Sequence, residues 1–117
     1  MKTLKTATGA RFQFKVHPDG EIIVYPESQG DLQDKSAIVI TPFTVGLVKQ
    51  AIRLAGKIRM GASRDNPPAS SLGALLKHER QSPQQLSYLI PLLVAEGFCE
   101  CMKDGQAYVV QYKGGPR

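Results

Sequence analysis

Residues 70–112 contain, in order, a short helical segment, a tight turn, a second helix and a β-hairpin. The second helix carries the clearest signals in the chain. Ser82 and Gln85 form a Ser-x-x-Gln capping box, and Pro83 suits the first helical position. An apolar stripe at helical spacing follows, made by Leu86, Leu89, Ile90, Leu93 and Val94. Gly97 then ends the helix. The sequence therefore predicts a helix over 83–96 and a hairpin over 98–112.

The first 40 residues have a different pattern. Residues 10–16 alternate apolar and polar side chains, as a half-buried strand does. A turn at 17–20 leads to a second strand over 21–25, and residues 37–40 are a third short strand. A lone hairpin is only marginally stable in water, so we expect these strands to pack on the rest of the chain or to pair with another chain. We divide the chain into a β-rich N-terminal extension, residues 1–40, and a second domain, residues 41–117.

The second domain is predicted to hold three helices. Thr41 can cap a helix over 42–58 and Pro42 suits its first turn, while a shorter helix is expected over 71–79. Pro91 is unusual within the third helix because proline lacks an N–H and clashes with the preceding turn. It leaves the carbonyl of Ser87 without its helical donor, so the helix should bend there.

The basic excess of the chain lies in its second part. The chain has 15 Lys and Arg against 10 Asp and Glu, a formal net charge of +5. Residues 1–40 hold five basic and five acidic residues, whereas residues 41–117 hold ten and five. Basic residues gathered on one part of a protein are typical of contact with nucleic-acid phosphates.

Other function classes have little support in the sequence. No apolar run is long enough to span a membrane, and no signal-peptide pattern follows the basic start, so we expect a cytoplasmic protein. Cys99 and Cys101 lie two apart on a predicted strand, a poor geometry for a disulfide. His17 and His78 lack metal spacing and any triad pattern. We predict no enzyme activity, no metal and no cofactor.

The stretch over 70–112 resembles winged helix-turn-helix regulators of the MarR-like and ArsR-like kind. The likeness lies in the Ser82 cap, the core beginning at Leu86 and the Glu96-Gly97-Phe98 end before a strand. It implies an α+β fold with a three-helix winged helix-turn-helix core, here preceded by an N-terminal β-hairpin or meander. It also implies a small DNA-binding protein, expected to be a homodimeric transcriptional regulator.

On this interpretation the 83–96 helix and a wing over 100–112 contact duplex DNA. The helix has no outward Arg or Lys, so base contacts would come from Gln84, Gln85, Ser87 and Tyr88. The expected phosphate contacts are Lys49, Arg53, Lys57, Lys77, Arg80, Ser82 and Lys103. Arg59 and Arg64 also flank the helices and suit phosphate contacts. The alternative is a protein–protein interaction module without DNA binding, which would expose Tyr88, Pro91 and Leu92 together as an apolar patch.

Overall fold

The computed structural model describes residues 2–6, 9–26, 37–61, 70–105 and 107–114 of the 117-residue chain. Its strands are β1 (Lys2–Lys5), β2 (Arg11–Val16), β3 (Ile22–Pro26), β4 (Ile38–Ile40), β5 (Lys57–Arg59), β6 (Cys99–Asp104) and β7 (Ala107–Tyr112). Its helices are α1 (Pro42–Ala55), α2 (Leu72–His78) and α3 (Leu86–Ala95). A 3₁₀ turn, η3 (Pro83–Gln85), leads directly into α3.

The N-terminal strands form one antiparallel sheet in chain order, β1-β2-β3-β4, which we call sheet A. The alternation seen in the sequence becomes its two faces, because successive side chains of a strand point to opposite sides. Phe12, Phe14 and Val24 point inward and are buried, while Lys5 and Arg11 are cross-strand partners that are both exposed. The inner face of sheet A therefore needs a partner layer.

The second sheet, sheet B, has the order β5-β7-β6. The predicted hairpin is present as β6 and β7, with Gly105 at φ 67° between them. The third strand, β5, lies where the sequence predicted the last turn of a helix running to residue 58. Gly56 has φ 76° and donates its N–H to the carbonyl of Ile52 at 2.9 Å, which ends α1. A left-handed conformation is one that glycine adopts readily, so the chain turns here into a strand.

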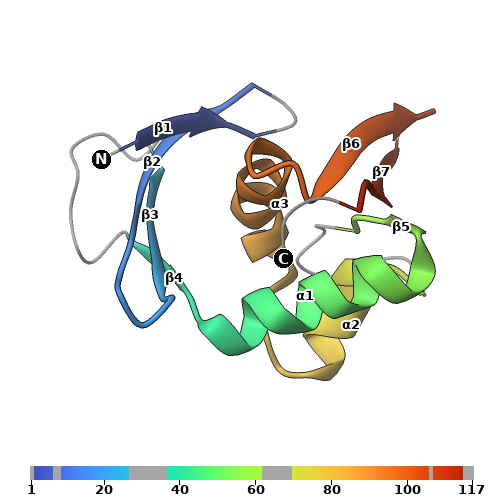
Figure 1. Ribbon diagram of the computed structural model, residues 1–117, viewed down its shortest axis with the longest axis horizontal. Coiled ribbons are helices and arrows are strands. Elements are labelled where there is room, and N and C mark those ends of the chain that lie inside the picture. The colour runs from blue at the N-terminus through green and yellow to red at the C-terminus, as the bar shows by residue number, and fades with distance from the viewer. Residues whose placement is uncertain (1, 7–8, 27–36, 62–69, 106, 115–117) are drawn as a thin grey trace.

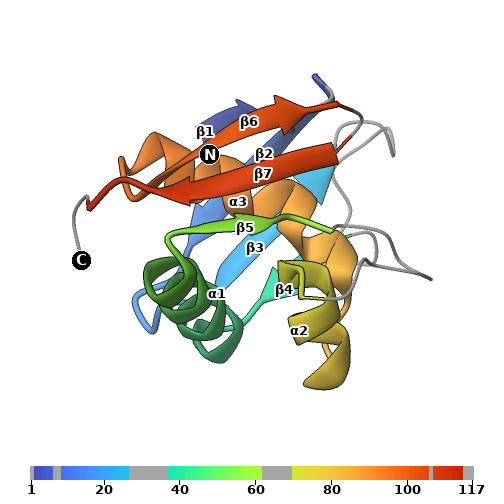
Figure 2. The ribbon, with the colours of Figure 1, turned by 90° about the vertical axis from the view of Figure 1, so that its right-hand side faces the viewer.

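Helix α3 lies between the two sheets (Figure 1). Sheet A covers one side of it and sheet B lies on the other, while α1 and α2 lie beneath β5 in the turned view (Figure 2). Five α3 residues are buried, namely Leu86, Leu89, Ile90, Leu92 and Leu93. Tyr88 meets Phe12 of sheet A edge-on, with ring centroids 5.2 Å apart and planes at 83°. One hydrophobic core consequently includes side chains of sheet A, all three helices and sheet B.

The predicted three-helix winged helix-turn-helix core is wrong, although the α+β class and three helices are observed. The structure is rich in strands, with two antiparallel sheets, and its helix and sheet order does not match that core. The sequence predicts one apolar stripe on the third helix. Leu92 and Tyr88 extend that stripe around the helix, and a helix that is apolar on most sides is buried. Sheet A packs against this second apolar side of α3.

Candidate functional site

The four predicted base-contact residues do not share one exposed surface. Gln84 is exposed, whereas Ser87 and Tyr88 are half-buried on the helix that sheet A covers. Gln85 is 9% exposed, and its buried side-chain Oε1 accepts no hydrogen bond from the described residues. Among the four, Gln84 alone is exposed. Base readout by Tyr88 would need sheet A to move away from α3, because its ring packs against Phe12.

Two of the predicted phosphate contacts lie over an aromatic ring. The Nζ of Lys49 is 5.4 Å from the ring centroid of Phe98, and the guanidinium of Arg53 is 5.9 Å from it. Phe98 itself is fully buried. Lys49 is also paired with Glu96 at 3.5 Å, so its charge is partly balanced, while Arg53 remains exposed.

Lys57 lies on β5 and not on α1, since α1 ends at Ala55. The four-residue spacing of Lys49, Arg53 and Lys57 is therefore not a continuous helical stripe. Arg59 follows two residues later on the same strand, and the half-buried Ile58 between them packs against the core. Lys57 and Arg59 thus both point away from the core. Arg59, which the sequence also marks as suited to phosphate contact, becomes a neighbour of Lys57 only because residues 57–59 are extended.

The remaining predicted contacts are spread over other elements. Lys77 is exposed in the last turn of α2, and Arg80 follows that helix at φ 62°. Ser82 caps η3, its Oγ accepting the N–H of Gln84 at 3.3 Å. Lys103 is exposed near the hairpin turn, with its Nζ 6.0 Å from the ring centroid of Tyr108. The structure brings none of these four onto β5.

Arg53, Lys57 and Arg59 form what we call the basic ridge. They are exposed and follow one another from the last turn of α1 into β5 through Gly56. Nearby acids are already engaged, Glu96 with Lys49 and Glu100 with Lys113, both at 3.5 Å. Within the described part of the chain, no carboxylate forms an ion pair with a member of the ridge. Three exposed cations thus follow one another within residues 53–59, and none is paired with a described carboxylate.

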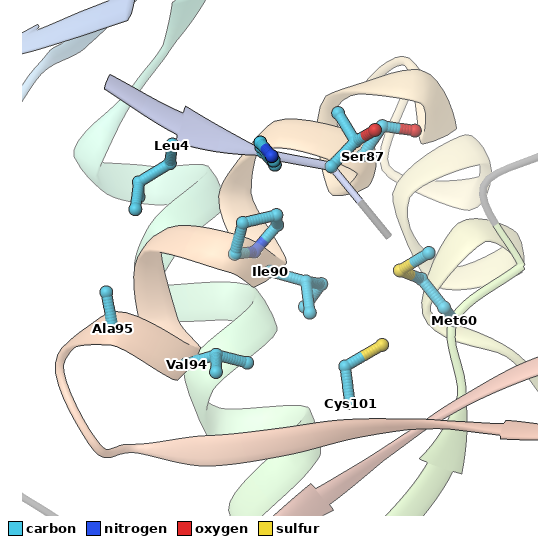
Figure 3. Close-up of a pocket in the computed structure, with 10 residues that line it drawn as sticks. Leu4, Met60, Ser87, Ile90, Val94, Ala95 and Cys101 are labelled. Atoms are coloured by element: carbon cyan, nitrogen blue, oxygen red, sulfur yellow. The ribbon is translucent and has the colours of Figure 1, made fainter. Parts of the chain in front are cut away.

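A groove with a volume of about 360 Å³ opens between sheet A, α3 and sheet B. Figure 3 shows Leu4 on one side, Cys101 and Met60 on the other, and Ile90 and Val94 between them on α3. Its walls are mostly apolar, and Lys5 is the one charged residue among the described residues that line it. The full lining is Leu4, Lys5, Thr6, Met60, Ser87, Ile90, Pro91, Val94, Ala95 and Cys101.

A second cavity of about 550 Å³ adjoins the groove and shares Leu4 and Ala95 with it. It lies at the C-terminal end of α3 and is lined there by Leu92 and Glu96, with Phe14 and Ile22 from sheet A. The apolar surface therefore continues along α3 on both sides of Leu4.

The patch proposed for a protein partner is not exposed as a unit. Leu92 is 6% exposed, and Tyr88 and Pro91 are half-buried. Pro91 lines the groove together with Ser87, whose carbonyl receives no helical N–H from position 91. The groove is an apolar surface that is open to a partner, with Val94 at 38% exposure.

Replacing Pro91 by alanine is expected to raise the free energy of unfolding by about 1 kcal/mol. Alanine returns an N–H to the carbonyl of Ser87, and a typical hydrogen bond contributes about this much. Urea unfolding of the P91A variant measures the change. A loss of stability would show that packing of the proline ring in the groove outweighs the missing hydrogen bond.

The two cysteines are free thiols of different burial. Cys99 is fully buried, and desolvation, then Cys101 and Glu96, raise its pKa to about 11. Cys101 is half-buried at the groove, and burial raises its pKa too. Neither is activated as a thiolate. Among the described residues no group of His, Cys, Asp and Glu side chains could hold a metal ion, and none of their helices is long and apolar enough to cross a membrane.

Comparison of the chain with models of protein families, with curated proteins and with solved structures finds no match in any of the three. The basic ridge and the groove are therefore the two candidate functional surfaces of this protein.

Proposed function

We propose that this protein binds duplex DNA through its basic ridge and contacts phosphates without reading bases. The observation that carries the proposal is the run of three exposed cations, Arg53, Lys57 and Arg59, that no described carboxylate balances. Phosphate contact supplies nearly all of non-specific DNA binding, and it needs such cations on an accessible surface.

The ridge is preorganised for this task. Arg53 lies over the buried ring of Phe98, which restricts its side chain before any ligand arrives. Lys57 and Arg59 are two residues apart on a strand, so their Cα atoms are roughly 6.6 Å apart and their side chains point the same way. Like charges held this close repel one another, and an anionic polymer relieves that repulsion.

Base readout has weaker support, because Gln84 alone of the predicted readers is exposed. Duplex DNA thus stays the proposed partner, but the basic ridge takes the place of the 83–96 helix and the 100–112 wing as the contact surface. A role in transcription regulation, and a homodimeric state, remain predictions from the sequence.

The test is a salt series of binding to a labelled random-sequence duplex, measured by fluorescence anisotropy. If three phosphates are neutralised, the logarithm of the binding constant should fall with the logarithm of salt concentration at a slope of about −2.7. A variant carrying R53Q, K57Q and R59Q should bind at least tenfold more weakly at 50 mM salt and lose most of that slope. AT-rich and GC-rich duplexes should bind alike.

The matched control carries K2Q, K5Q and K15Q, which remove the same charge from exposed positions of sheet A. It should retain the affinity and the slope of the original protein to within about twofold, because those positions lie outside the ridge. Equal losses of affinity in both variants would show that net charge alone determines DNA binding, and would contradict the proposal. Absence of binding at low salt and micromolar protein would refute it.

Protein binding is the second candidate function. It is favoured by one observation, the apolar groove that two sheets and α3 enclose. Protein-binding sites are recognised by such open apolar surface with polar surroundings.

A further inference from the structure

We propose that the groove takes up an extended segment of a partner protein, in which apolar and acidic side chains alternate, as an added strand beside β1. This proposal is independent of DNA binding, since none of the groove residues belongs to the basic ridge. It rests on three features: a strand edge that no described strand pairs with, the direction of the side chains along that edge, and the charge of sheet A.

Strand β1 is an edge strand of sheet A and borders the groove. The N–H of Thr6 donates to the carbonyl of Ala10 on the β2 side at 2.8 Å. Hydrogen-bonded residues alternate along an antiparallel strand, so Leu4 and Lys2 also direct their backbone groups toward β2. The N–H and C=O groups of Thr3 and Lys5 therefore point outward from the sheet. Such an edge is a ready template for an extended chain.

The register decides where the side chains of an added strand would go. Residues that lie opposite each other on neighbouring strands point to the same face. Leu4 is opposite the buried Phe12 and faces α3, so the added residue beside Leu4 would also face α3. That residue would enter the groove between Val94 and Cys101, where the walls are apolar.

The neighbouring positions of the added strand would lie on the outer face of sheet A. Lys5 and Arg11 are cross-strand partners on that face, and Lys15 is exposed there too. The described residues of β1 and β2 include no Asp or Glu. Acidic side chains at alternate positions of the added strand would thus meet positive charge. An added strand with apolar side chains toward α3 and acidic side chains on the outer face of sheet A would therefore alternate the two residue types along its sequence.

A second copy of this chain fits the groove less well than a free segment does. Its own β1 is already bonded to β2, so it would bring a whole sheet with it. The groove is walled on the far side by Cys101 of β6 and by Met60, and its volume of about 360 Å³ is near the lower end for ligand sites. This space holds a few side chains of a single strand.

The probe is a blocked, fluorescein-labelled heptapeptide of alternating glutamate and valine, titrated with the full chain and followed by anisotropy. We expect saturable binding, and at least tenfold weaker binding of the same peptide with N-methylated amides at its glutamate positions. A peptide of alternating lysine and valine should also bind at least tenfold more weakly. Equal affinity for all three peptides, or no binding of the first up to millimolar concentration, would overturn the proposal.

The matched variants are V94D in the groove and L54D outside it. Val94 is 38% and Leu54 79% exposed, so both proteins should fold with an aspartate there. V94D should weaken peptide binding at least tenfold and L54D less than twofold. Saturating peptide should also slow maleimide modification of Cys101 in the original protein. Equal peptide affinities of V94D and the original chain would contradict the proposal. So would dimerisation in the absence of peptide that V94D abolishes and L54D does not, because this result would assign the groove to a second copy of the chain.

Discussion

Replacing Phe12 by alanine is expected to lower the free energy of unfolding by about 4 kcal/mol. Phe12 is fully buried between sheet A and α3, and its ring meets Tyr88 edge-on at 5.2 Å. Truncation of a buried phenylalanine typically costs about 3–5 kcal/mol, through lost transfer free energy and the cavity left behind. The edge-on pair adds about 0.5–1.5 kcal/mol to its area burial. Urea unfolding measures the change, which is a large share of the roughly 5–15 kcal/mol that stabilise a typical domain.

The control for this experiment is V39A, on the same sheet. Val39 is 46% exposed, so its truncation should change stability by less than about 0.5 kcal/mol. A loss below about 1 kcal/mol in F12A would mean that sheet A is not docked on α3. Helix α3 would then not be covered by sheet A.

The free energy of unfolding is expected to fall by about 2 kcal/mol between pH 9 and pH 11 because of Cys99. Burial raises the pKa of this thiol from 9.0 to about 11. Below pH 9 the thiol is protonated in both states and contributes no pH dependence. Above pH 9 the unfolded chain releases the proton while the folded chain retains it, which favours unfolding until the folded-state pKa is reached. Two pKa units correspond to about 2.7 kcal/mol.

Comparison with C99A isolates this effect, because lysine and tyrosine side chains also titrate in this range. Urea midpoints measured from pH 8 to pH 11 should fall more steeply for the original chain than for C99A. Parallel pH profiles of the two proteins would contradict the burial of the Cys99 thiol.

The sequence by itself determined the elements whose signals are local. Thr41 caps α1 by accepting the N–H of Thr44 at 3.3 Å, and Ser82 caps η3 as its position before Pro83 predicts. The β6–β7 hairpin lies where alternation and the Asp104-Gly105 turn indicate it. Capping, turn geometry and periodicity involve residues a few positions apart, so they can be read without knowing the fold.

Tertiary structure alone decided where these elements pack and which surfaces stay open. Nothing local to residues 83–96 shows that sheet A, some 70 residues earlier, covers the second apolar side of α3. Residues 57–59 become a strand because β7 offers them an edge, with Ile58 opposite Val110, and that pairing puts Lys57 and Arg59 on one face. The groove likewise exists only where β1, α3 and β6 meet. Burial and strand pairing between distant segments determine these features, and they depend on the whole chain.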